Sequence, residues 1–150
     1  MDRAISGSDL DRALHPKGIE SVASLCQRWP AVLPPPDKIL CSPALRTRQT
    51  ANELIKRLEL NTDCMEVINA LYMADVQTME SCLFSQSPGL RTLCVIGHNP
   101  GITGWFQSFD PPVDFPFLTP CGMASVRFEG EGWNQFPLAS KTVTHIDIPN

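Results

Sequence analysis

Two short apolar segments, residues 37–41 (DKILC) and 91–97 (RTLCVIG), are each followed closely by a turn that can start a helix. The turns are Ser42-Pro43 and Asn99-Pro100, in which Ser or Asn can cap a helix and Pro suits its first turn. A buried strand that leads directly into a helix is typical of a parallel sheet, because parallel strands are joined by helical crossovers. The two segments therefore predict an α/β fold.

The remaining pattern agrees with this fold class. Apolar spacing predicts helices at 15–29, from 42 to about 58, and 75–84, with a proline-rich connector, PAVLPPP, that ends the first helix. Further strands are expected at 64–68, 123–129 and 142–148, and the run at 91–97 is expected to be a buried central strand. We expect a three-layer αβα arrangement, with a mainly parallel sheet covered by helices on both faces. The length of 150 residues, without a repeat or linker, indicates one domain, 1–150.

Charge and hydropathy exclude several functions. Twelve Lys and Arg against 16 Asp and Glu give a net charge of -4, and no basic block is present. This balance argues against nucleic-acid or membrane-surface binding. No apolar run approaches the roughly 20 residues that cross a bilayer, and the first residues resemble no signal peptide. We therefore expect a cytoplasmic protein of undetermined oligomeric state.

The six cysteines are scattered through apolar segments without CxxC spacing, so we expect buried, reduced thiols and neither a zinc site nor a disulfide framework. Cys41 and Arg46 are separated by four residues, whereas a cysteine phosphatase needs a five-residue phosphate loop between thiolate and arginine. The intervening SPAL also lacks the glycines of such a loop. The absence of a G-x-S-x-G motif argues against a serine hydrolase.

The chemistry that remains lies on the two strand-to-helix turns. Arg46 is expected in the first turn of one helix and His98 at the end of the strand before the other. An arginine beside free helix N–H groups can grip an oxyanion with two hydrogen bonds, and a histidine can donate, accept or attack. Because the carboxyl ends of parallel strands open on one edge, we expect Arg46 and His98 to converge on one phosphoryl group.

Structural explanations of the same residues stay open at this point. A lone arginine near a helix start is more often a solvated surface residue, and a lone histidine more often structural. His15 and His145 are interpreted as structural, and Arg48 as pointing to solvent.

Three segments resemble, in the same order, the histidine phosphatase superfamily with its phosphoglycerate mutase-like fold. They are SDLDRALHPKG (8–18), ILCSPALRTRQTA (39–51) and VIGHNPG (95–101), and SPALRTRQTA is the most specific. The chain is most similar to the SixA-like phosphohistidine phosphatases, a resemblance that also includes Leu71-Tyr72 and residues 119–122. It implies a phosphatase without cofactor that acts on a phosphorylated protein or a small phosphate compound.

The resemblance further implies roles for three residues. Arg46 matches an arginine that clamps the oxygens of the transferring phosphoryl group, and His98 matches a histidine that binds and neutralises it. Asn99 would place a helix N-terminus beside the same anion.

The family's other arginine and its nucleophilic histidine form an Arg-His pair at the end of a first, central strand, and this sequence contains no Arg-His pair. Neither His15 nor His145 matches the nucleophile. Three explanations are open: a reading frame begun too late, which we favour, a truncated remnant, or a catalytically inactive module that binds phosphate or a phosphoprotein. As written, the chain is expected to be inactive.

Larger family members that cleave phosphate esters carry a glutamate in the segment that corresponds to 69–75, and here that segment reads NALYMAD. Asp75 is interpreted as a helix cap. The lack of an acid fits a phosphoramidate such as phosphohistidine, because its imidazole leaves with less help than an alkoxide.

Overall fold

The computed structural model describes residues 9–111 and 114–149. These residues form two compact units. The first includes the described chain up to Tyr72 and also Thr92–Gly97, and the second includes Met73–Arg91 and the described residues from His98 onward. Ser8, in the first of the family-like segments, and residues 112–113, in the loop expected after the helix that follows His98, lie outside the described residues.

A three-stranded parallel sheet forms the centre of the first unit. Its order is β2 (Met65–Val67), β1 (Lys38–Cys41) and β3 (Leu93–Ile96). In the central strand, Ile39 pairs with Met65 on one side and Cys94 on the other, and Ile39 and Leu40 are completely buried. The three strands predicted in this part of the chain are therefore confirmed, with their ends shortened by one or two residues.

The position of β3 differs from the sequence-based prediction of a buried central strand. Among the described residues of the first unit, β3 pairs only with β1 and lies at the edge of the sheet. All four of its residues are half-buried, whereas three of the four in β1 are buried. A continuous apolar run signals a strand but does not say on how many sides it is paired.

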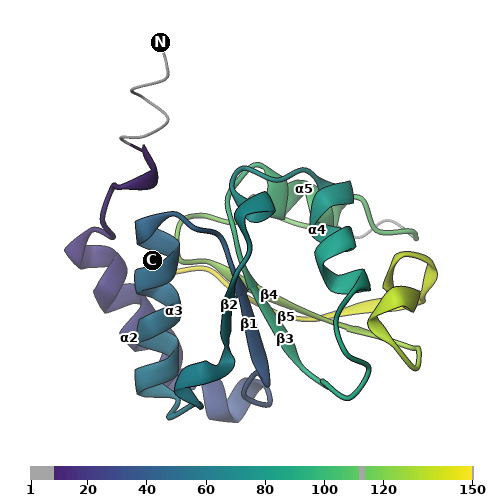
Figure 1. Cartoon of the computed structure of the whole chain (residues 1–150), viewed down its shortest axis with the longest axis horizontal. Helices are drawn as coiled ribbons and strands as arrows, with labels where there is room; N and C mark the ends of the chain where they lie inside the picture. The colour runs from purple at the N-terminus through teal and green to yellow at the C-terminus, as the bar shows by residue number, and fades with distance from the viewer. Residues whose placement is uncertain (1–8, 112–113, 150) are drawn as a thin grey trace. The chain divides into compact units, whose positions relative to one another are not determined.

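Two helices lie side by side in the first unit, α2 (Pro16–Val32) and α3 (Leu45–Arg57) (Figure 1). They turn apolar faces inward; the buried residues are Val22, Leu25, Cys26 and Trp29 on α2, and Thr47, Ala51, Leu54 and Ile55 on α3. The proline-rich connector does not end α2 at Trp29, because Pro30 falls in the last turn, where a missing N–H removes only one helical hydrogen bond. Two short 3-10 turns, η1 (Thr62–Cys64) and η2 (Asn69–Leu71), flank β2.

The second unit combines two helices with an antiparallel hairpin. Its elements are α4 (Val76–Phe84), α5 (Gly101–Gln107), β4 (Met123–Phe128), η3 (Trp133–Leu138) and β5 (Lys141–Asp147). β4 and β5 pair antiparallel, and the core beside them is aromatic. Phe106 stacks on Phe115 with ring centroids 4.6 Å apart, and Trp105 meets Phe136 edge to face at 5.8 Å. Together, the parallel sheet, the helices and the hairpin confirm the predicted α/β class.

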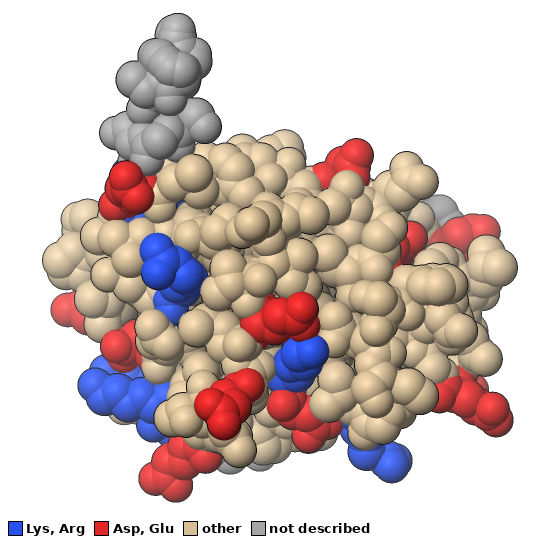
Figure 2. All heavy atoms as spheres, viewed as in Figure 1, with Lys and Arg blue, Asp and Glu red and all other residues tan. Residues whose placement is uncertain are grey.

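The surface carries charges of both signs. On the face drawn in Figure 2, Lys and Arg alternate with Asp and Glu across a largely uncharged background. Within residues 9–111 and 114–149, none of the helices has the length and apolar character of a membrane span.

Candidate active site

The turn after β1 is held by hydrogen bonds among its own residues. The Ser42 N–H still donates to Ile96 O (3.0 Å), which continues the sheet by one residue, and Ser42 Oγ accepts from the Ala44 N–H (3.3 Å). Thr47 Oγ1 lies 2.9 Å from Ser42 O and 2.8 Å from Ala44 O, close enough to donate to either. Because Ser42 is used in this turn, α3 begins at Leu45 rather than at the expected Ser42-Pro43, and Arg46 stands in its first turn as predicted.

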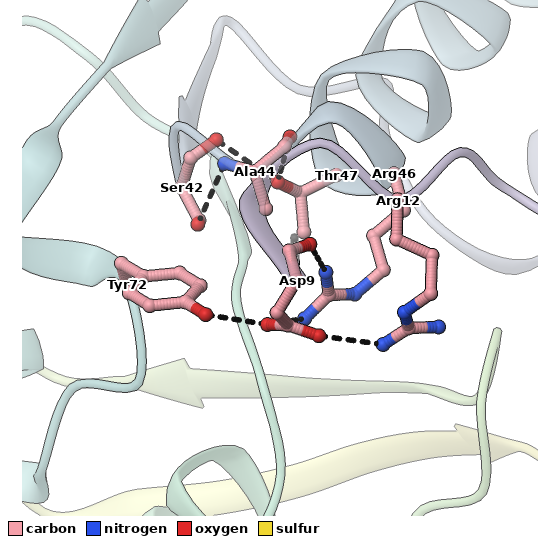
Figure 3. A network of polar contacts seen from close by, with 7 residues as sticks. All are labelled: Asp9, Arg12, Ser42, Ala44, Arg46, Thr47 and Tyr72. Atoms are coloured by element: carbon pink, nitrogen blue, oxygen red, sulfur yellow. Dashed lines mark hydrogen bonds and ion pairs between the residues drawn. The ribbon is translucent and has the colours of Figure 1, made fainter. Parts of the chain in front are cut away.

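The guanidinium of Arg46 holds an anion of the protein itself. Nη2 of Arg46 donates to Asp9 Oδ2 (3.1 Å), and Nη1 donates to the Asp9 carbonyl oxygen (2.7 Å). Arg12 Nη2 donates to the other carboxylate oxygen, Oδ1 (2.9 Å), and the Tyr72 hydroxyl donates to Oδ2. Figure 3 shows these donors from three separate segments pointing at the one carboxylate.

The donors determine the charge state of Asp9. The hydrogen bond from Tyr72, followed by those from Arg12 and Arg46, holds the pKa of the Asp9 carboxyl far below its usual range, against the opposing effect of burial. The same contact raises the pKa of the Tyr72 hydroxyl, because the neighbouring carboxylate disfavours a phenolate. Asp9 is therefore an anion at any physiological pH, and Arg46 is an ion-paired, partly buried arginine rather than a solvated surface arginine.

The turn after β3 carries His98 and Asn99 and belongs to the second unit. Asn99 Oδ1 accepts from the Thr103 N–H (3.1 Å) and from Thr103 Oγ1 (2.7 Å), and its amide nitrogen donates to Leu118 O. The Ile102 N–H donates to His98 O (2.9 Å). The Asn99 side chain thus joins the start of α5 to the loop near Leu118, so its contribution to an anion site would come from placing this helix start and the adjacent His98.

The predicted site residues are divided between the units. Arg46 lies in the first unit, whereas His98 and Asn99 lie in the second, and each turn is defined by contacts inside its own unit. The structure adds Asp9, Arg12 and Tyr72 to Arg46. All three occur in segments that carry the family resemblance, and this is the sequence signal that could have identified them.

Several residues have structural roles in place of catalytic ones. His15 caps α2, with Nδ1 accepting from the Lys17 N–H (3.0 Å), and Asp75 caps α4 by accepting from the Thr78 N–H (2.9 Å), as the sequence predicted. His145 lies on β5. The prediction for Arg48 is wrong: its Nε donates to Pro43 O (3.0 Å), and the residue is half-buried because it closes the turn after β1.

The cysteines are free thiols, and three of them, Cys26, Cys41 and Cys64, are buried. Burial raises the pKa of Cys41, at the end of β1, to about 11. A thiol with this pKa is a poor nucleophile near neutral pH. In the part of the chain that the structure describes, no three His, Cys, Asp or Glu side chains gather as a metal site would require.

Known structures share this fold. The chain superposes on a protein assigned as the phosphohistidine phosphatase SixA of Nakamurella multipartitia with a TM-score of 0.80, at 23% identity over 94% of this chain and 87% of that one. The protein histidine phosphatase SixA in complex with tungstate superposes with a TM-score of 0.78, at 24% identity over 94% of this chain and 86% of that one. A protein assigned as the phosphohistidine phosphatase SixA of Agrobacterium tumefaciens superposes with a TM-score of 0.59, at 25% identity over 67% of this chain and 63% of that one.

The family of the chain is shown by comparison of sequences. No curated protein matches the chain. The sequence model of the histidine phosphatase superfamily (branch 1) matches residues 2–82, more than half of the chain, and this span contains Arg46 with its partners Asp9, Arg12 and Tyr72. The chain therefore belongs to the histidine phosphatase superfamily.

Proposed function

We propose that this chain binds the phosphoryl group of a phosphorylated substrate through Arg46 and His98, as part of phosphatase chemistry directed at phosphohistidine on a protein. A small phosphate compound is the other substrate class that the same residues would accept. The observation that supports the proposal is the Arg46 guanidinium, which, from the first turn of a helix, donates one hydrogen bond to the Asp9 carboxylate and one to the Asp9 backbone carbonyl oxygen. A planar guanidinium that binds a carboxylate in this way is equally suited to phosphate oxygens.

His98 supplies the second contact in this proposal. It lies in a strand-to-helix turn of the kind that binds anions in α/β proteins, and Asn99 anchors that turn through Thr103 and Leu118. In its imidazolium form His98 would add positive charge to the phosphoryl group, and in its neutral form one hydrogen bond. The SixA of known structure that holds tungstate, a tetrahedral oxyanion, supports an anion as the ligand.

The substrate class follows from the residues near Tyr72. The segment 69–75 has no glutamate to protonate an alkoxide, and its aspartate, Asp75, is used to cap α4. A phosphoramidate needs less acid assistance, which favours phosphohistidine over a phosphate ester. The SixA proteins of similar fold, which are described as phosphohistidine phosphatases, support this choice.

Binding is tested by phosphate titration calorimetry at constant ionic strength. Arg46→Lys keeps the charge but loses the planar fork, so phosphate affinity should fall about tenfold. His98→Ala should weaken binding most below neutral pH, where imidazolium adds charge. Arg57→Lys is the matched control, because Arg57 lies on the same helix and pairs with Glu53 at the surface (2.9 Å). If Arg46→Lys and Arg57→Lys bind phosphate like the wild type, the proposal is wrong.

Turnover separates an enzyme from a binding module. The 150 residues hold three histidines, of which His15 caps a helix and His145 lies on β5, and a phosphoenzyme intermediate needs a nucleophile. We therefore expect these residues to bind a phosphohistidine peptide without hydrolysing it. Release of phosphate that disappears in both His98→Ala and Arg46→Ala would contradict this expectation and show that these residues contain a nucleophile.

A further inference from the structure

The carboxylate of Asp9 receives hydrogen bonds from three side chains that are distant from one another in sequence. Arg12 Nη2 donates to Oδ1 (2.9 Å), while Arg46 Nη2 (3.1 Å) and the Tyr72 hydroxyl donate to Oδ2 (Figure 3). Neither partner of the Arg46 ion pair is deeply buried, since the Asp9 side chain is 27% exposed and that of Arg46 is 17% exposed. An exchange of ligands at these donors therefore requires little desolvation.

Two guanidinium groups and a phenol form a donor set suited to an oxyanion, and a carboxylate is the oxyanion that a protein chain can itself supply. A carboxylate offers one charge and two oxygens to these donors. A phosphate dianion offers two charges and more oxygens, so it can satisfy the same donors and make further hydrogen bonds. The set around Asp9 is therefore better matched to phosphate than to the group that occupies it.

Among the described residues, the segment that carries Asp9 contacts the rest of the first unit through side-chain hydrogen bonds and not through a helix or strand. After Asp9 and Leu10 it runs without a helix or strand until α2 begins at Pro16. It is anchored at Leu14, whose N–H donates to Gln49 Oε1 on α3 (2.7 Å). Asp9 lies before this anchor, so displacement of its carboxylate would not require α2 or α3 to move.

We propose that Asp9 is an internal competitor: its carboxylate occupies an oxyanion site formed by Arg46, Arg12 and Tyr72, and a phosphate group binds these donors by displacing it. The proposal rests on the phosphate-binding function proposed above and adds two residues, Arg12 and Tyr72, to the binding site. In this exchange an anion with two charges replaces a carboxylate with one at the same donors.

The opposite role for Asp9 would be to position Arg46 for phosphate. The two roles predict opposite changes in phosphate affinity when the charge of Asp9 is removed. If Asp9 competes, its neutralisation removes both the occupant and the repulsion between a carboxylate and the incoming phosphate, so affinity rises. If Asp9 positions Arg46, its neutralisation releases the guanidinium, and affinity falls.

The experiment measures inorganic phosphate binding by calorimetry at neutral pH and constant ionic strength. Asp9→Asn should bind phosphate about tenfold more tightly than the wild type. The matched control is Asp11→Asn, which removes the same charge from an exposed residue of the same segment and should change affinity less than about twofold. In the Asp9→Asn background, Tyr72→Phe should weaken binding, because the hydroxyl then donates to phosphate.

Affinity in Asp9→Asn that is equal to or lower than in the wild type overturns the competitor role, as does an equal gain in Asp11→Asn. Measuring Arg46→Lys in the wild-type and Asp9→Asn backgrounds shows whether only the competitor role is wrong or the proposed phosphate binding is wrong as well. If Arg46→Lys weakens binding in both backgrounds while Asp9→Asn brings no gain, phosphate binds at Arg46 but Asp9 is not its competitor. If Arg46→Lys has no effect in either background, both proposals are wrong.

A second measurement uses the wild-type chain and does not depend on the folding of a variant. The pKa of the Asp9 carboxyl is followed by carbon-13 NMR with and without saturating sulfate, which stays a dianion through the usual titration range of a carboxyl group. Displacement should raise the Asp9 pKa toward the usual range, because the carboxylate loses its three donors. An Asp9 pKa that stays low while sulfate binds overturns the proposal.

Discussion

Among single residues, the polar side chains of the turn after β1 and of the turn after β3 have different roles. Arg46 uses its guanidinium on a partly exposed anion, whereas Asn99 uses its whole side-chain amide to tie Thr103 to Leu118. Thr103 completes that second network, because its Oγ1 also accepts from the Leu118 N–H (3.0 Å). One turn therefore presents a group that can exchange ligands, and the other is built to be rigid.

The charge on Asp9 predicts a pH-dependent contribution to stability. Its pKa is lowered in the folded chain, so the ionised carboxylate stabilises the fold at pH above the unfolded value of about 4, and this contribution is lost as pH falls below it. Asp9→Asn should therefore be less stable than the wild type near pH 7, with the difference shrinking between about pH 4 and pH 3. Urea denaturation at several pH values measures it. A difference that is constant or that grows in acid contradicts the prediction, and Asp11→Asn serves as control.

Asn99→Ala should be strongly destabilising, because it leaves donors and acceptors at Thr103 and Leu118 without their partner in a partly buried site. The expected loss in unfolding free energy is about 2–3 kcal/mol. Asn52→Ala is the matched control, since Asn52 is exposed on α3 and should change stability by less than about 0.5 kcal/mol. Denaturant unfolding of the two variants compares them, and equal effects would show that the Asn99 network contributes little.

At the scale of elements, local signals were sufficient for most helices and strands. The caps at His15 and Asp75, the apolar faces of α2 and α3 and the apolar runs of β1 and β3 could all be predicted from neighbouring residues. The errors lie at element ends, where contacts from elsewhere in the fold compete with local preference. Ser42 shows this: its N–H bonds to Ile96 O on β3, so Ser42 extends the sheet and the helix starts later.

The two glycines of α5 offer a matched test of packing around this element. A Cβ added at Gly101 would collide with the backbone carbonyl oxygen of Ala74, whereas one added at Gly104 would meet no atom within 4 Å. Gly101→Ala should therefore destabilise the chain, by about 1–3 kcal/mol. Gly104→Ala should be neutral or stabilising by up to about 1 kcal/mol, because alanine favours the helix. Thermal unfolding compares them, and a reversed order would show that α5 does not approach Ala74 closely.

At the scale of the whole molecule, the chain passes between the two units more than once. The first unit takes its third strand, β3, from Thr92–Gly97, which lies between two segments of the second unit. Neither unit is therefore a continuous stretch of chain, and the central strand β1 is flanked on both sides only when β3 is in place.

This connectivity predicts one cooperative unfolding transition, as expected of the single domain proposed from the sequence. Pulsed hydrogen exchange at increasing urea concentration can follow β1 in the first unit and α4 in the second as separate peptides. Their unfolding midpoints should coincide within about 0.2 M urea, because β3 cannot leave β1 without pulling on the segments that flank it. Two well-separated midpoints would show that the units are independent domains.

Local sequence patterns were enough to predict which segments are helices or strands, the position of Arg46 in a helical first turn, and the motifs of the superfamily. These depend on residue periodicity and capping within a few positions along the chain. The folded chain was needed to show that Asp9, Arg12 and Tyr72 lie around Arg46, and that β3 lies at the edge of its sheet in the first unit. The contacts of Arg46 and Tyr72 with Asp9, and of β3 with β1, join residues far apart in sequence, so periodicity and capping do not encode them, and the burial and pairing of the entire unit select them.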